Sequence, residues 1–110
     1  MWIISKLGFY SIVRDRDDAG SYWVRARVRA DLERLTSILP GEIIFMPDAD
    51  YRFRVKLSRE EKNRAVALLS DSIDYPNFKN EIARDATQRD RLTAYHEVWH
   101  TLQGLAGKGH

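Results

Sequence analysis

Two stretches of the chain alternate between apolar and cationic residues. Residues 23–29 read WVRARVR and residues 51–57 read YRFRVKL. A period of two is typical of a β-strand that buries one face and exposes the other. We therefore expect one set of side chains in these strands to face a core, namely Val24, Ala26, Val28, Tyr51, Phe53, Val55 and Leu57.

Helical patterns follow both strands. Residues 30–39 carry Leu32, Leu35, Ile38 and Leu39 at helical spacing, and the Pro-Gly pair at 40–41 ends the segment. Ser58 and Glu61 form the capping-box pattern that opens a second helix. Val66, Leu69 and Ile73 would lie on its apolar side. Further helical segments are expected after Pro76, where Phe78 and Ile82 share a face, and at about 87–105.

The remaining apolar runs complete a sheet. Residues 2–4, 9–13 and 42–46 are rich in β-branched and aromatic side chains. We predict a single α+β domain over residues 1–110, with a flexible tail at about 106–110. Its antiparallel-rich four-stranded sheet would have the order ββαββα, with helices on one face and a further C-terminal helix. That order is a ferredoxin-like unit with its last strand moved to the front, which predicts a split βαβ crossover from the second strand to the fourth.

Composition narrows the class of protein only slightly. The 110 residues include no cysteine, which excludes disulfides and thiolate metal sites. No apolar run approaches the roughly 18 residues of a membrane span, and the N-terminus lacks the features of a signal peptide. We expect a cytoplasmic protein without a membrane partner. The net charge of +2 is too small to indicate nucleic acid by itself.

His96, Glu97 and His100 near the C-terminus match the His-Glu-x-x-His zinc motif. Two histidines four apart on a helix can bind one metal ion, and the glutamate can act as general base. A catalytic zinc needs a third protein ligand, and the sequence selects none. The same helix has an apolar stripe that includes Tyr95 and Trp99. We interpret it as a docking helix that inserts these two rings into the core, and keep a zinc-dependent hydrolase as the alternative.

The basic side of the two alternating strands is the stronger candidate. If the apolar sides face the helices, a row of cations emerges on the other sheet face, with Tyr10 or Tyr22 beside it. Arginine forks and aromatic rings suit single-stranded nucleic acid or an acidic protein. The alternative is a solvated face braced by carboxylates such as Glu42 and Asp48. The predicted polyanion-binding residues are Arg25, Arg27, Arg52, Arg54 and Lys56.

Protein interaction is a third class of function. The chain has three tryptophans and five tyrosines. Exposed rings near Trp2, Trp23 or Tyr75 could anchor a partner or a homodimer; the alternative is that they fill the core.

Six stretches spread over the chain form a distinctive set: Met1-Trp2, Gly8 to Val13, Val24 to Arg29, Asp50 to Arg54, Asp74 to Lys79 and Tyr95 to Trp99. In these stretches the chain resembles an uncharacterised family of small bacterial proteins. The resemblance implies a common fold but no particular activity. His100, the second histidine of the zinc motif, lies outside the shared stretches. We therefore predict a binding module, rather than an enzyme, with no cofactor.

Overall fold

The computed structural model describes residues 1–108. Its contacts divide the chain into two compact units, Met1–Asp74 and Tyr75–His110, and each is described by itself. The expectation of a single domain stays a prediction. No helix among the described residues is long and apolar enough to cross a membrane.

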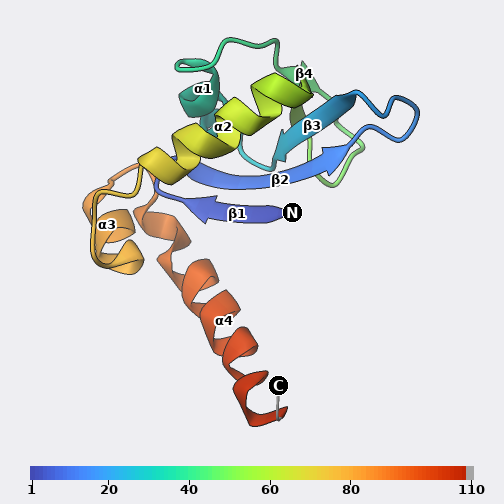
Figure 1. Ribbon diagram of the computed structural model, residues 1–110. Coiled ribbons are helices and arrows are strands. Elements are labelled where there is room, and N and C mark those ends of the chain that lie inside the picture. Colours follow the sequence, from blue (N-terminus) through green and yellow to red (C-terminus); the bar gives the residue numbers. More distant parts are fainter. Residues whose placement is uncertain (109–110) are drawn as a thin grey trace. The chain divides into compact units, whose positions relative to one another are not determined.

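The first unit is built on a five-stranded antiparallel sheet with the order β1-β2-β3-β5-β4 (Figure 1). Two helices follow its third and fifth strands. The α+β class and the antiparallel sheet are confirmed. The elements of this unit are β1 (Trp2–Ser5), β2 (Gly8–Arg14), β3 (Ser21–Ala26), α1 (Arg29–Thr36), β4 (Ile44–Phe45), β5 (Phe53–Ser58) and α2 (Arg59–Asp71).

The four-stranded ββαββα prediction is wrong because the N-terminal apolar region forms a hairpin of two strands. The chain turns at Lys6 and Leu7, and Ser5 pairs with Gly8. Gly8 has φ 155°, and a Cβ atom there would lie 2.4 Å from Cγ of Asp31. Only glycine fits this turn without displacing that side chain.

The predicted crossover is also corrected. β3 and β5 are antiparallel neighbours, so β5 cannot be the parallel strand of a split βαβ unit. Because β4 is antiparallel to β5 as well, β4 runs parallel to β3, with β5 between them. α1 therefore connects β3 to β4.

Helices α1 and α2 lie on the same side of the sheet, and the core is between them and the strands (Figure 1). Tyr10 is fully buried there, and its hydroxyl donates a hydrogen bond of 2.6 Å to the carbonyl of Asp31 in α1. The capping box is confirmed: the Glu61 amide donates to the Ser58 hydroxyl, and the Ser58 amide donates to the Glu61 carboxylate. The buried apolar cluster is Tyr10, Ile12, Val24, Ala26, Leu32, Leu35, Leu39, Val55, Leu57, Ala65 and Leu69.

Three predicted core positions are exposed, and a fourth is buried elsewhere. Val28 is 43% exposed because the strand ends at Ala26 and Val28 caps α1. Ile38 and Ile73 are exposed, because each follows the end of its helix. Tyr51 is buried but does not belong to the cluster beneath the helices. Phe53 and Val66 pack against that cluster and are half-buried.

The second unit is helical. It contains α3 (Phe78–Arg84), the short 3₁₀ turn η1 (Arg89–Arg91), α4 (Leu92–Gln103) and a final 3₁₀ turn η2 (Ala106–Lys108). Phe78 contacts the rings of both Tyr75 and Tyr95, with centroids 6.2 and 5.6 Å apart. Of the tail expected to be flexible, residues 106–108 form that last turn, and residues 109–110 lie outside the described part of the chain.

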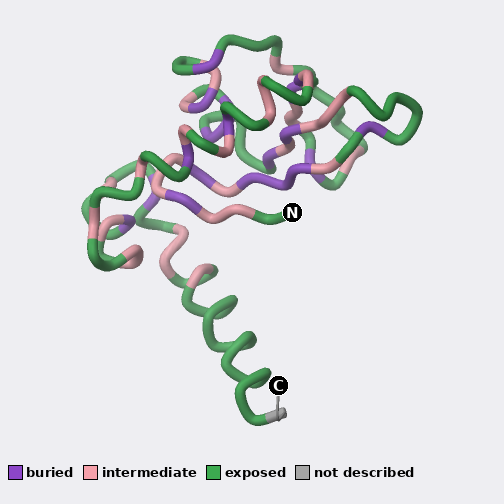
Figure 2. The backbone as a smooth tube through the Cα atoms, viewed as in Figure 1, coloured by how far each residue is buried: buried purple, intermediate pink, exposed green. Residues whose placement is uncertain are grey.

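The interpretation of the C-terminal helix is only partly right. Tyr95 is half-buried, but Trp99 is 48% exposed and therefore does not insert into a core. No residue of α4 is classed as buried, and Figure 2 shows most of its tube as exposed. The apolar stripe that the sequence predicts is present, and Val98, Leu102 and Leu105 expose it to solvent.

Candidate functional site

The sheet surface opposite α1 and α2 carries four of the five predicted cations. We call this surface the arginine face and define it by Arg25, Arg27, Arg54 and Lys56. Val24, Ala26, Val55 and Leu57 point to the core, so alternation directs Arg25, Arg54 and Lys56 to the other side. Arg27 follows the end of β3 but contacts the Tyr51 ring, as Arg25 does.

Arg52 is exposed, and its membership of this group stays a prediction. It lies outside β5 in the segment that leads into it, where its carbonyl accepts a hydrogen bond from the amide of Met46. No contact ties its side chain to the other four cations in the part of the chain that the structure describes.

Aromatic rings lie between the cations, but they are not the rings that the sequence suggested. Tyr51 is 6% exposed, and the guanidinium carbons of Arg25 and Arg27 lie 4.7 and 4.3 Å from its ring centroid. The centroid of the Trp23 ring lies 5.6 Å from both Cζ of Arg54 and Nζ of Lys56. These are cation–π distances. The face is therefore a mixed cationic and aromatic surface.

Neither predicted tyrosine belongs to the arginine face. Tyr10 is buried beneath α1. Tyr22 pairs with Leu57 in the sheet, and the ammonium of Lys62 in α2 lies 4.5 Å from its ring. Trp23 could have been predicted from the sequence, because it lies two residues before Arg25 and therefore points to the same side of the strand. Tyr51 could not be predicted in this way, since the chain bends between it and β5.

Two of the four cations have carboxylate partners. Arg27 lies 3.4 Å from Asp50, and both side chains are exposed. Lys56 lies 3.6 Å from the Oδ2 atom of Asp15. An exposed ion pair such as Arg27–Asp50 contributes little to stability. The bracing carboxylates are thus Asp15 and Asp50 instead of the predicted Glu42 and Asp48.

Arg25 and Arg54 have a different environment. They are directly opposite each other on β3 and β5, and neither forms an ion pair within the described residues. Arg25 donates to the Ser11 hydroxyl at 2.7 Å, and Arg54 donates to the Tyr51 carbonyl at 3.0 Å. Burial and repulsion from Arg25 lower the pKa of Arg54 below its usual value. Like charges directly opposite each other destabilise a sheet.

Asp15 organises the rim beside this pair. Its Oδ1 accepts hydrogen bonds from the amides of Asp17 and Asp18, and its Oδ2 accepts one from the Trp23 indole at 2.8 Å. These bonds, led by that of the Asp17 amide, hold the pKa of Asp15 below its usual value. The carboxylate therefore fixes the Trp23 ring and stays ionised beside Lys56.

The zinc motif lies on α4 as predicted. The His96 ring stacks on Trp99 with centroids 5.5 Å apart, and its Nδ1 atom lies 3.2 Å from Nζ of Lys79. An ammonium at this distance occupies one of the two nitrogens of His96. Within residues 1–108, no three acidic or histidine side chains are arranged to hold a metal ion. The His96–His100 pair thus has no third ligand within that part of the chain.

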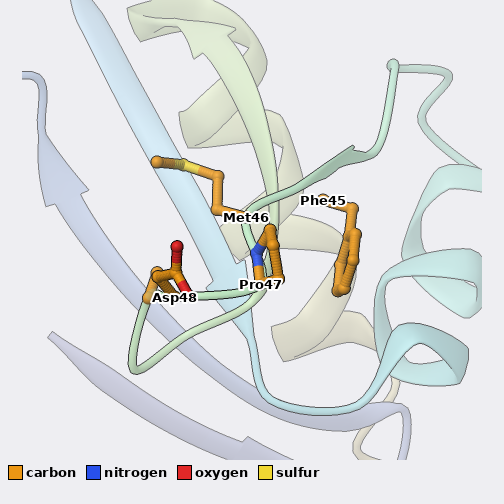
Figure 3. A pocket seen from close by; sticks show the side chains of 5 residues that line it. Phe45, Met46, Pro47 and Asp48 are labelled. Carbon is orange, nitrogen blue, oxygen red and sulfur yellow. The ribbon is translucent and has the colours of Figure 1, made fainter.

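A surface hollow lies next to β4 and has a volume of about 390 Å³. One continuous segment, residues 45–49, lines it, and Figure 3 shows Phe45 and Met46 pointing away from each other. Phe45 stacks on Phe53 with centroids 5.3 Å apart. The hollow gathers no groups from separate elements and no cation, so it is a weaker candidate than the arginine face.

A scan against models of protein families, a search of curated proteins and a search of solved structures all found no match to the chain. The function therefore has to be inferred from the residues themselves.

Proposed function

We propose that the chain is a non-enzymatic binding module whose arginine face binds a polyanion, with single-stranded nucleic acid as the best fit. The observation that supports this most is the cross-strand pair Arg25 and Arg54. Two cations that face each other without a carboxylate disfavour folding, whereas a bound anion would relieve their repulsion.

The rings on the same face favour nucleic acid over an acidic protein. The Trp23 ring is held by Asp15 and is partly exposed. Trp2 is 65% exposed and contacts Phe9 with ring centroids 5.6 Å apart; it pairs with Ser11, whose hydroxyl accepts from Arg25. Rings of this kind can stack on bases while cations neutralise the phosphates.

We also propose that the first unit has a ferredoxin-like topology. Strands β2, β3, β5 and β4 with α1 and α2 would form the permuted unit, and β1 would be an addition. In such a unit both helices cover one sheet face, which leaves the other face to a ligand within the first unit.

The test is a salt titration of a fluorescent, unstructured oligonucleotide with the parent protein and with Arg25→Gln/Arg54→Gln. We expect binding at low salt, with a log–log salt slope of roughly −0.7 for each phosphate contact. The double variant should weaken binding and flatten the slope by about two contacts.

The matched control is Arg59→Gln/Arg64→Gln, which removes the same charge from exposed positions of α2 on the opposite side of the sheet. It should leave the slope nearly unchanged. Equal losses for the two double variants would indicate only a net-charge effect and contradict the proposal. If an acidic peptide binds more tightly than the oligonucleotide, the ligand of the arginine face is a protein instead of a nucleic acid.

A further inference from the structure

The arginine face has one place where charge, shape and unpaired donors coincide. Arg25 and Arg54 contribute to the wall of a surface hollow of about 520 Å³, which we call the arginine hollow. Trp23, Met46, Arg14 and Arg16 also line it. These residues come from β2, β3, β5 and the segments after β2 and β4, so the sheet brings together cations that are far apart in the sequence.

Both central arginines retain an unpaired donor. The Nε atoms of Arg25 and Arg54 are shielded from solvent and have no hydrogen-bond partner. A buried N–H group without an acceptor is energetically unfavourable. Each guanidinium has one hydrogen bond that holds it, to Ser11 or to Tyr51. A small rotation of either fork toward an oxyanion would give its Nε–H an acceptor.

The two acidic residues at the hollow do not neutralise this pair. Asp15 already accepts from two amides and the Trp23 indole, and its remaining charge is opposed by Lys56. Asp17 is exposed at the rim. Arg25 and Arg54 thus present two positive charges to the hollow without an ion-pair partner among the described residues.

Resting on the proposed function, we infer that the arginine hollow is a subsite for one dianionic phosphate group, either free or as the terminal phosphomonoester of a nucleic acid. Two guanidinium forks can each donate two parallel N–H bonds to phosphate oxygens. Their combined charge matches a phosphomonoester dianion better than the single charge of an internal phosphodiester. The subsite would therefore distinguish a phosphorylated end from the rest of a strand.

The first experiment uses inorganic phosphate as the probe, at constant ionic strength set with chloride. The side-chain Nε–Hε signals of Arg25 and Arg54 are followed by ¹H–¹⁵N NMR of the full chain, and single Arg→Lys variants assign them. We expect both signals to shift in a saturable way at pH 7.5, and less at pH 5.5, where phosphate is a monoanion. Shifts that rise linearly without saturation would overturn the inference.

The second experiment distinguishes the two sources of phosphate. Oligonucleotides of one sequence carry a 5′-phosphate, a 3′-phosphate or neither. We expect at least one phosphorylated end to bind about ten-fold more tightly, which corresponds to about 1.4 kcal/mol. Arg54→Gln should remove this preference, while Arg64→Gln, which removes a cation from an exposed position of α2, should keep it. Unchanged core amide signals would show that each variant is folded.

The outcomes separate the two claims. Saturable phosphate binding without oligonucleotide binding would sustain the subsite and contradict the proposed function. Equal binding of all three oligonucleotides, with no response to phosphate, would sustain the proposed function and overturn the subsite.

Discussion

The sheet of the first unit and helix α4 of the second carry equally clear amphipathic patterns with different outcomes. In the sheet, Val24 and Val55 are at most 2% exposed because α1 and α2 cover that side. In α4, Val98, Trp99 and Leu102 are 38–56% exposed. A periodic pattern of apolar residues thus identifies which residues share a face. It does not show whether another element of the chain covers that face.

The largest expected effect compares a leucine from each pattern. Leu32 of α1 is fully buried, whereas Leu102 of α4 is 56% exposed. Leu32→Ala should lower the free energy of unfolding by about 2–5 kcal/mol because it leaves a cavity. Leu102→Ala should change it by no more than about 0.5 kcal/mol. Urea denaturation monitored by circular dichroism measures both, and similar losses would show that the stripe of α4 is buried in solution.

A smaller effect concerns acid and the rim of the arginine face. The pKa of Asp15 is lowered in the folded state, so its stabilising contribution is complete above its unfolded pKa of about 3.9 and is lost as the pH falls through the folded value. The urea midpoint should therefore decrease as the pH falls from 5 to 2, and Asp15→Asn should flatten this dependence.

The control for that measurement is Asp17→Asn. The backbone amide of Asp17, rather than its carboxylate, takes part in the bonds to Asp15, so this variant should keep the pH dependence of the parent. If the urea midpoint of Asp15→Asn falls with pH as steeply as that of the parent, the hydrogen bonds to Asp15 do not cause the loss of stability in acid.

The smallest expected effect concerns zinc on α4. A bound structural zinc would raise the melting temperature by mass action. We expect no change on adding an equivalent of zinc, since the ammonium of Lys79 lies against His96 and no third ligand is brought to the pair within residues 1–108. One equivalent of zinc by elemental analysis, lost in His100→Ala, would instead favour the hydrolase with Glu97 as its base.

The sequence was informative for the two alternating strands and for the helix cap. Alternation predicted the inward set of β3 and β5 and thereby the side on which Arg25, Arg54 and Lys56 emerge. The Ser58–Glu61 cap was equally predictable, since its bonds form within one helical turn.

Other features depend on contacts that no local pattern encodes. Glycine is needed at position 8 because the distant side chain of Asp31 lies where a Cβ atom would be. Tyr51 lies beneath Arg25 and Arg27 because the chain bends just before β5. The pairing of Arg25 with Arg54 requires the strand register, which two separate alternating segments cannot supply.

Binding at the arginine face can be tested directly by mapping which residues respond to an oligonucleotide. Backbone amide and indole signals of the full chain are followed by ¹H–¹⁵N NMR during titration at low salt. We predict that the changes concentrate on β2, β3 and β5, including the Trp23 indole, and that α1, α2 and α4 change little. Changes confined to α4, or spread evenly over both units, would contradict a function that resides on the arginine face.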